Sequence, residues 1–195
     1  RLTRAKALIK NANTLLTVSD RTKEDLGYFL NIPSERIQTI PLGQTNLPLH
    51  TEADLPPALA GQPYFLALGT NDPRKNISCV ISAFQELIRH PKYQNIKLVL
   101  IGKTDHADIV LNYSIPHTSL FTLHSSRAPD ALLRTLMRHA TLLLYPSWYE
   151  GYGLPLHETA VYGTPIIAST AGALPETAPQ GTRFAPPFKP HLWTQ

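Results

Sequence analysis

Two glutamates and a pair of basic residues are the side chains of this sequence with the clearest potential for chemistry. Glu150 and Glu158 are separated by seven residues, in a segment that also carries two closely spaced glycines. Arg74 and Lys75 are adjacent and follow a segment with a glycine and a proline. Carboxylates accept hydrogen bonds from hydroxyl groups, whereas an arginine fork and a lysine ammonium suit phosphate oxygens. Taken singly, each could equally be a solvated side chain or one that complements a helix dipole.

The segment around the glutamates is expected to run strand, loop, helix, strand. The short apolar run 141–145 is stopped by Pro146 and predicts a buried strand. Pro155 suits the first position of a helix and Gly163 suits its end, before a second strand at 164–168. Glu150 would then lie in the loop and Glu158 in the first helical turn. Such a loop, at the C-terminal end of a strand and before a helix N-terminus, is where open α/β sheets bind ligands and where anions are attracted.

The segment from Glu150 reads Glu-Gly-Tyr-Gly-Leu-Pro-x-x-Glu-x-x-x-x-Gly-x-Pro-Ile-Ile-Ala-Ser. This string strongly resembles the donor-site signature of the retaining glycosyltransferases of the GT-B class, in family 4 (glycosyl transferases group 1). The resemblance implies transfer of a sugar from a nucleoside-diphosphate sugar to a hydroxyl acceptor, with no metal and no other cofactor. It implies that Glu158 holds the ribose hydroxyls and that Glu150 contacts the donor sugar. The backbone groups expected to assist are those of Gly151, Tyr152, Gly153 and Leu154.

A second segment of the resemblance concerns the diphosphate. Residues 69–76 read Gly-Thr-Asn-Asp-Pro-Arg-Lys-Asn and resemble the diphosphate-binding segment of the same family. The resemblance assigns Gly69, Arg74 and Lys75 to this contact and makes Arg74 and Lys75, with Glu150, the expected catalytic residues. Many members have arginine directly after the glycine, where this chain has Thr70, so one cationic contact is missing or is replaced by Arg74.

A third segment, 124–127, follows a predicted strand and by resemblance lies near the nucleobase. We expect Ser125 and Arg127 to contribute to the nucleotide site. Arg127 could instead be a solvated residue, and Lys103 has the same ambiguity. The family favours glycine where this chain has His124, which leaves the identity of the base open. Glu176, in a Pro-Glu element after the last donor-site strand, is expected to be structural.

Composition limits the other classes of function. The formal net charge is +4 and the basic residues are scattered, which argues against a nucleic-acid binder but allows peripheral contact with an anionic membrane surface. The single cysteine, Cys79, cannot form an internal disulfide and suits a reducing compartment, so we expect a cytoplasmic protein. No signal-peptide pattern or long apolar span is present. The histidines show no metal-ligand spacing, and no Asp-x-Asp metal-binding motif occurs.

The remaining pattern predicts an α/β protein with a Rossmann-like parallel sheet flanked by helices, the C-terminal half of a GT-B fold. Apolar strands alternate with amphipathic helices, which favours right-handed βαβ units. The predicted strands are 64–68, 97–101 and 120–123, and the predicted helices are 76–90, 104–111 and 129–140. We divide the chain into residues 1–46 (the end of an N-terminal acceptor-side domain), a proline-rich linker at 47–63, and a nucleotide-sugar-binding domain at 64–195. In 1–46 we expect strands at 14–18 and 36–40 and a helix capped by Ser19.

The expected partners are a nucleotide-sugar donor, a glycan or lipid-linked acceptor, and an N-terminal domain outside a chain that reads as a fragment. The Pro-Arg-Lys-Asn form favours GDP-mannose as donor by resemblance. Two alternatives stay open: a phosphorylase-like or epimerase-like relative on the same fold, which bound pyridoxal phosphate or an epimerised product would reveal, and a non-catalytic nucleotide-sugar-binding subunit.

Overall fold

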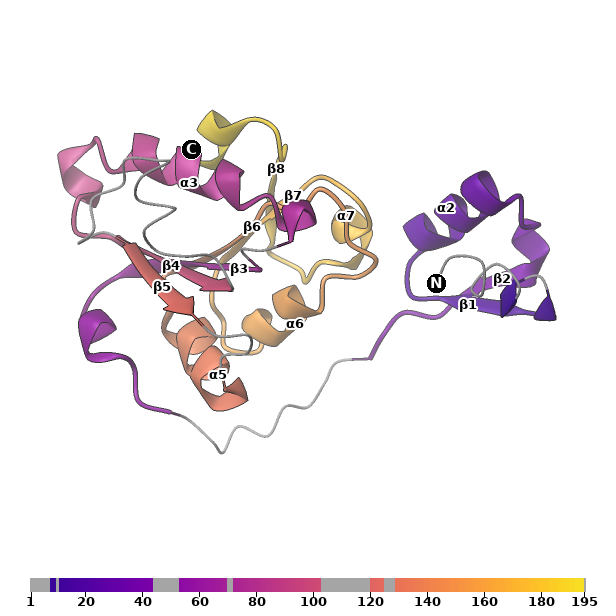
Figure 1. Ribbon diagram of the computed structural model, residues 1–195, viewed down its shortest axis with the longest axis horizontal. Coiled ribbons are helices and arrows are strands. Elements are labelled where there is room, and N and C mark those ends of the chain that lie inside the picture. The colour runs from indigo at the N-terminus through magenta and orange to yellow at the C-terminus, as the bar shows by residue number, and fades with distance from the viewer. Residues whose placement is uncertain are drawn as a thin grey trace.

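The structure is a computed structural model that describes residues 8–9, 11–43, 53–69, 72–102, 120–124 (backbone only) and 129–194. It confirms the predicted α/β class. A six-stranded sheet, parallel throughout, has the strand order β5-β4-β3-β6-β7-β8 (Figure 1). The strands are β3 (Tyr64–Leu68), β4 (Lys97–Gly102), β5 (Leu120–His124), β6 (Leu142–Tyr145), β7 (Ile166–Ser169) and β8 (Arg183–Ala185). The order runs outward from β3 in one direction and from β6 in the other, as in doubly wound folds.

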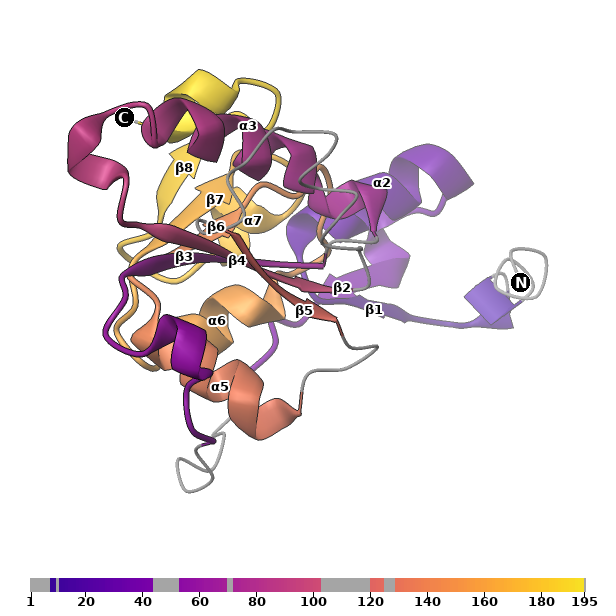
Figure 2. The same ribbon diagram turned by 60° about the vertical axis from the view of Figure 1, so that its left-hand side comes forward.

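Helices cover both faces of this sheet. Helix α3 (Ile77–Leu87) and the 3-10 helix η6 (Pro190–Trp193) lie on one face, and α5 (Asp130–His139) and α6 (Leu154–Ala160) lie on the other (Figure 2). A short helix, α7 (Leu174–Thr177), follows β7. Three further 3-10 turns in this part are η2 (Pro57–Leu59), η3 (Pro73–Lys75) and η4 (Pro91–Tyr93). None of the helices in the described residues is both long and apolar enough to cross a membrane.

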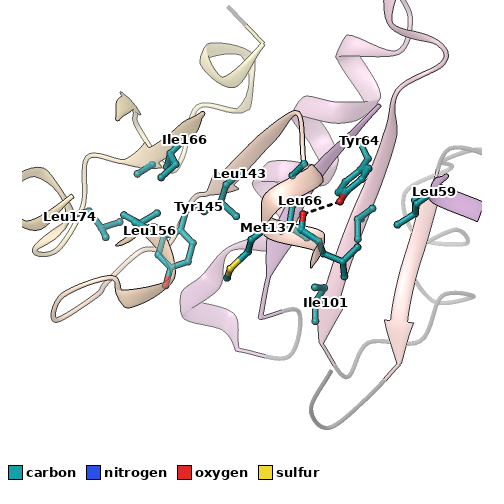
Figure 3. Packing of buried hydrophobic residues seen from close by; sticks show 14 residues of the cluster. Leu59, Tyr64, Leu66, Ile101, Met137, Leu143, Tyr145, Leu156, Ile166 and Leu174 are labelled. Carbon is teal, nitrogen blue, oxygen red and sulfur yellow. Dashed lines mark hydrogen bonds between the residues drawn. The ribbon is translucent and has the colours of Figure 1, made fainter. Parts of the chain in front are cut away.

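Alternating residues of the central strands contribute to two hydrophobic cores, one on each face of the sheet. Leu66 and Val99 point toward the face of α5 and α6, whereas Ala67 and Leu100 point toward α3. All four are fully buried. Figure 3 shows the first core, in which the Tyr64 hydroxyl donates a hydrogen bond to the Leu136 carbonyl at 2.9 Å. Because both faces are covered, central strands such as β3 carry apolar residues toward both sides, as expected for a buried parallel sheet.

Residues 11–43 form a separate βαβ unit. Strands β1 (Leu15–Thr17) and β2 (Ile37–Thr39) pair in parallel, joined by α2 (Asp20–Leu30) and the 3-10 turn η1 (Ser34–Arg36). The predicted cap is confirmed, because the Ser19 hydroxyl accepts a hydrogen bond from the Thr22 N–H. The two strands are shorter than predicted.

Several predicted boundaries differ for local reasons. The helix predicted at 76–90 begins at Ile77, because Asn76 takes a left-handed conformation (φ 50°), and ends at Leu87. The strand predicted from 164 begins at Ile166, since the Thr164 hydroxyl bonds the Met137 carbonyl and Pro165 has no N–H to donate.

Other differences concern segments rather than ends. The described part of the expected linker, residues 53–63, packs on the sheet domain and contributes the buried Leu59 to its core. Strand β8 and helix α7 were not predicted. The helix predicted at 104–111 lies outside the described residues.

Candidate functional site

The candidate site lies where the winding of the sheet reverses. Strands β3 and β6 are hydrogen-bonded neighbours, and their C-terminal ends lie at the same edge of the sheet. The chain leaves β3 toward β4 and leaves β6 toward β7, on opposite sides. This is the switch point at which open α/β sheets bind ligands. The segments that follow these two strands carry Lys75 and Glu150, respectively.

Two side chains from these segments and one from the end of β6 form one hydrogen-bonded group, the Lys75–Tyr145–Glu150 cluster. Lys75 Nζ lies 2.7 Å from Glu150 Oε1 and 2.7 Å from the Tyr145 hydroxyl. The tyrosine hydroxyl in turn donates to the same glutamate oxygen at 3.1 Å. Both charged side chains are mostly buried, with 19% and 14% of their surface exposed. The structure therefore brings together two of the three residues expected to be catalytic, although 75 positions separate them.

Tyr145, the last residue of β6, contacts both charged side chains of this cluster. Its ring is buried, and Lys75 Nζ lies 4.8 Å from the ring centroid, a cation–π contact. Burial, and then the negative charge of Glu150, raise the pKa of the tyrosine well above its ordinary value. The hydroxyl therefore stays protonated at neutral pH and donates a hydrogen bond to the Glu150 carboxylate.

The lysine side is positioned by Gly69 and Asn76. Gly69 has φ 89°, which favours glycine, and a Cβ at this position would lie 2.7 Å from Lys75 Cγ, so a larger residue would push the lysine stem aside. Asn76 is buried and donates from Nδ2 to the carbonyls of Pro146 and Pro187. The turn after β3 is thereby fixed to the loop after β6.

The glutamate side is positioned by the segment after β7. Ala173 N–H donates to the Glu150 carbonyl at 3.0 Å. Gly172 has φ 62°, and a Cβ there would lie 2.7 Å from the Glu150 nitrogen. The backbone of Glu150 thus rests directly on a glycine 22 positions further along the chain.

Arg74 lies beside the cluster but does not join it. Its guanidinium makes hydrogen bonds to both carboxylate oxygens of Asp72, the shortest at 2.6 Å, and 63% of its side chain is exposed. The arginine bonds lower the pKa of the Asp72 carboxyl. The expected diphosphate contact is therefore held at the surface by a neighbouring residue.

Glu158 is half-buried on α6, and its carboxylate makes no hydrogen bond or ion pair with any described residue. The expectation that it lies in the first helical turn is wrong, because Gly153 takes a left-handed conformation and the helix begins at Leu154, making Glu158 its fifth residue. Its negative charge is, after burial and Glu150, a further cause of the raised pKa of Tyr145.

The loop between Glu150 and α6 leaves backbone donors available. Within the described part of the chain, no acceptor is bonded to the N–H groups of Tyr152, Gly153 or Leu154. The Thr177 hydroxyl donates to the Tyr152 carbonyl, and the Tyr152 ring stacks on His157 at 5.0 Å. These contacts hold the loop that carries the predicted sugar-binding groups, including Gly151.

The same loop and α7 also contact the N-terminal unit. The Tyr149 hydroxyl donates to Asp25 Oδ2 at 2.6 Å, and the Tyr152 hydroxyl donates to the Leu42 carbonyl at 2.7 Å. The Glu176 carboxylate accepts hydrogen bonds from the N–H groups of Asp20 and Arg21 at the start of α2. Glu176 therefore acts as a helix cap, in agreement with the expected structural role.

Some predicted site residues cannot be compared with the structure. Ser125, Arg127, Thr70 and Lys103 lie outside the described residues, and for His124 only the backbone is described. Sequence reasoning missed Tyr145, Asn76 and Gly172. A signal existed for the first of these, because Tyr145 places a polar group at the end of an otherwise aliphatic strand, directly before the loop. Within the described ranges, no group of three His, Cys, Asp or Glu side chains is arranged to hold a metal ion.

Comparison with known proteins identifies the family. The family model for glycosyl transferases group 1 matches residues 55–187, which include the Lys75–Tyr145–Glu150 cluster. The chain belongs to this family of glycosyltransferases. It is 32% identical over 187 residues to O-antigen chain mannosyltransferase B of Escherichia coli, covering 92% of this chain and 49% of that protein. It is 32% identical over 176 residues to the MMP alpha-(1->4)-mannosyltransferase of Mycolicibacterium hassiacum, covering 88% of this chain and 40% of that protein.

Solved structures confirm the GT-B fold. A sucrose-phosphate synthase from Thermosynechococcus elongatus matches 99% of this glycosyltransferase chain and 50% of its own, with a TM-score of 0.76 and 23% identity. HepE from Anabaena, solved in complex with UDP and glucose, matches the whole chain and 56% of its own with a TM-score of 0.74 and 16% identity. The chain thus spans about half the length of the proteins it matches.

Proposed function

We propose that this chain is the donor-binding half of a retaining mannosyltransferase that moves mannose from GDP-mannose to a hydroxyl of a glycan or lipid-linked acceptor, in the synthesis of a cell-surface polysaccharide. The observation that carries the proposal is the Lys75–Tyr145–Glu150 cluster at the switch point, where a cation and a carboxylate are both held mostly out of solvent. The choice of mannose is supported by the names of the relatives, which are mannosyltransferases matched over nearly the whole chain.

In this proposal Lys75 and Arg74 meet the charge that develops on the departing nucleoside diphosphate. Lysine supplies a point charge and arginine a fork, so together they suit the two phosphates. Arg74 is exposed, so its guanidinium is free to turn from Asp72 toward a phosphate. Such fixed charges at a developing anion are often the largest contribution to catalysis.

The glutamates serve different parts of the donor. Glu158 accepts hydrogen bonds from the ribose hydroxyls, a role that its lack of a partner among the described residues leaves open to it. Glu150 and the N–H groups of residues 152–154 contact the sugar. Gly69, Ser125 and Arg127 complete the nucleotide site.

The acceptor site is proposed to come from an N-terminal domain, of which residues 1–46 would be the last part. We further propose that the enzyme works in the cytoplasm, with peripheral contact to the membrane where its acceptor is lipid-linked. No metal is required in this proposal, because cationic side chains and backbone dipoles meet the diphosphate charge.

Transfer assays on the full-length protein test this proposal. The donors compared are GDP-mannose, GDP-fucose, UDP-glucose and UDP-galactose, each with and without excess chelator. We expect mannose transfer with retained α-configuration from GDP-mannose, an unchanged rate in chelator, and no transfer by residues 1–195 alone. Preference for a UDP-sugar would overturn the donor assignment, and a rate restored only by Mg²⁺ or Mn²⁺ would overturn metal independence. Tight donor binding without any transfer would favour a binding subunit, and an epimerised product would favour an epimerase.

A further inference from the structure

Lys75, which is proposed to bind the diphosphate, already forms an ion pair with a carboxylate of the same chain. Lys75 Nζ contacts Glu150 Oε1 at 2.7 Å, and both side chains are mostly buried. A shielded ion pair of this kind is little weakened by salt. The more buried of the two basic residues of the site, Lys75, is therefore paired with a carboxylate of the same chain.

A nucleoside diphosphate must compete with this carboxylate. The diphosphate oxygens and Glu150 Oε1 both need the same ammonium group, and two anions placed side by side repel each other. Binding the diphosphate therefore costs either the Lys75–Glu150 contact or the repulsion between two anions. If Glu150 contacted only the sugar, it would have almost no effect on the affinity for a nucleoside diphosphate. Because Glu150 also pairs with Lys75, we expect it to weaken that affinity.

An intact nucleotide sugar offers compensation that the bare diphosphate lacks. Its sugar hydroxyls can donate hydrogen bonds to Glu150, so the carboxylate gains new partners as Lys75 turns to the phosphates. Once the sugar has gone to the acceptor, Glu150 has no such partner and regains Lys75. Resting on the proposed function, we infer that Glu150 is a specificity-determining residue that discriminates against the product, by competing with the nucleoside diphosphate for Lys75 while accepting the donor.

Tyr145 lies beside both side chains that change partners when the donor binds. Its hydroxyl contacts both members of the pair, at 2.7 Å from Lys75 Nζ and 3.1 Å from Glu150 Oε1. The hydroxyl stays protonated, so it continues to donate to the glutamate when the lysine leaves. The ring is buried at the end of β6, which holds the hydroxyl in place beside both side chains.

Calorimetric titrations of the full-length protein with GDP and with GDP-mannose test the inference, with UDP and UDP-glucose run beside them. In Glu150→Gln the shape is kept and the competing charge is removed. We expect GDP to bind roughly 10- to 150-fold more tightly than to the wild type, the range that corresponds to one charged hydrogen bond made available to the phosphates. GDP-mannose should bind with unchanged or weaker affinity, so the ratio of donor to product affinity falls. Product inhibition of the residual turnover should strengthen in parallel.

Two further variants sharpen the result. Glu176→Gln removes one negative charge that contacts α2 and not Lys75, so its GDP affinity should stay within about twofold of the wild type. Glu150→Asp keeps the negative charge but places the carboxylate farther from Lys75, because aspartate is one methylene group shorter. It should therefore strengthen GDP binding less than Glu150→Gln does. Thermal unfolding of each variant shows that it is folded.

The outcomes separate this inference from the proposed function. If the wild type binds GDP and transfers mannose, but Glu150→Gln binds GDP equally or more weakly, the competition is wrong and the proposed function stands. An equal gain in Glu176→Gln would also overturn it, because a general charge effect would explain the data. If the wild type and Glu150→Gln bind none of the four nucleotides, the donor site itself is wrong and both proposals fall.

Discussion

The two parallel sheets of this chain differ in how their apolar surfaces are covered. In the six-stranded sheet both faces are buried under helices, and residues such as Leu66 and Leu100 have no exposed surface. In the β1–α2–β2 unit no residue of the helix is buried. Tyr28 and Phe29 on that helix are 80% and 71% exposed. The six-stranded sheet thus has a core on each face, whereas among the described residues of the β1–α2–β2 unit only Ile32 and Ile37 are buried apolar side chains.

The difference bears on how each region is stabilised. A two-stranded sheet with one helix buries too little apolar surface to be stable alone. In this structure the N-terminal unit is joined to the sheet domain by a few polar contacts, made by Tyr149, Tyr152 and Glu176. We therefore expect the sheet domain to control the stability of the chain and the N-terminal unit to follow it.

The largest expected effect comes from matched leucine truncations in the two regions. Leu66→Ala in β3 should lower the free energy of unfolding by about 2 to 5 kcal/mol, because it leaves a cavity in a closed core. Leu16→Ala in β1, where the side chain is 65% exposed, should change it by less than about 0.5 kcal/mol. Urea unfolding of residues 1–195 measures both. Equal costs would show that the N-terminal unit has a core of its own.

A second pair of variants compares two glycines within the sheet domain. Gly172 and Gly163 both have positive φ, but a Cβ at Gly172 would clash with the Glu150 backbone, whereas at Gly163 nothing lies within 4 Å. Alanine should cost about 1 to 2 kcal/mol at each from the left-handed backbone. Gly172→Ala should cost a further 1 to 3 kcal/mol or so from the clash, and should displace Glu150 and lower turnover of the full-length enzyme. Similar stability and turnover for the two variants would contradict the positioning role of Gly172.

The same contrast explains what the sequence could predict. Strands such as 64–68 were predicted at their observed bounds, because continuous apolar runs between proline and glycine are a strong local signal. The site signatures placed Glu150 in a loop after a strand and Lys75 between a strand and a helix, as the structure has them, with Lys75 in the 3-10 turn η3. The Ser19 cap was predicted from one residue and its position.

What could not be predicted depends on contacts distant in sequence. The position of Gly172 under Glu150, and the use of Glu176 to cap α2, join segments that no periodicity connects. The pairing of Lys75 with Glu150 was hidden because each residue was assigned to a ligand and not to the other. Short elements such as β8 have too few residues to show a pattern.

A smaller effect is expected for the cap between the two regions. Glu176→Ala removes the acceptor of two N–H groups at the start of α2, a loss typically worth about 0.5 to 2 kcal/mol to a helix. Amide hydrogen exchange should speed up in α2 and stay unchanged in β3 and β6. Ser19→Ala, which removes the cap within the helix's own segment, serves as the matched control. If Glu176→Ala speeds exchange throughout the sheet domain, the two regions are more tightly coupled than their contacts indicate.

The smallest effect is expected for a single hydroxyl at the contact between the regions. Tyr149→Phe removes the hydrogen bond to Asp25, which lies at the surface and should contribute less than about 1 kcal/mol. Burial and the Asp25 carboxylate raise the pKa of Tyr149 above its usual value of 10.0. A group whose pKa is raised by folding stabilises fully below its unfolded pKa, so the contact should be constant at neutral pH and weaken as the pH rises beyond about 10. Hydrogen exchange in α2 at neutral pH measures the loss in Tyr149→Phe.

Tyr64→Phe is the matched change within the core, because it also removes one hydroxyl, here bonded to the Leu136 carbonyl. That carbonyl also accepts from the Ala140 N–H, so it keeps a partner, and the cost should be about 0.5 to 1.5 kcal/mol. The cost should appear in global urea unfolding, since Tyr64 lies in the core that controls the whole domain. Tyr149→Phe should leave global unfolding unchanged and affect only α2. A global loss in Tyr149→Phe as large as that in Tyr64→Phe would mean that the polar contact, and not the closed core, limits the stability of the chain.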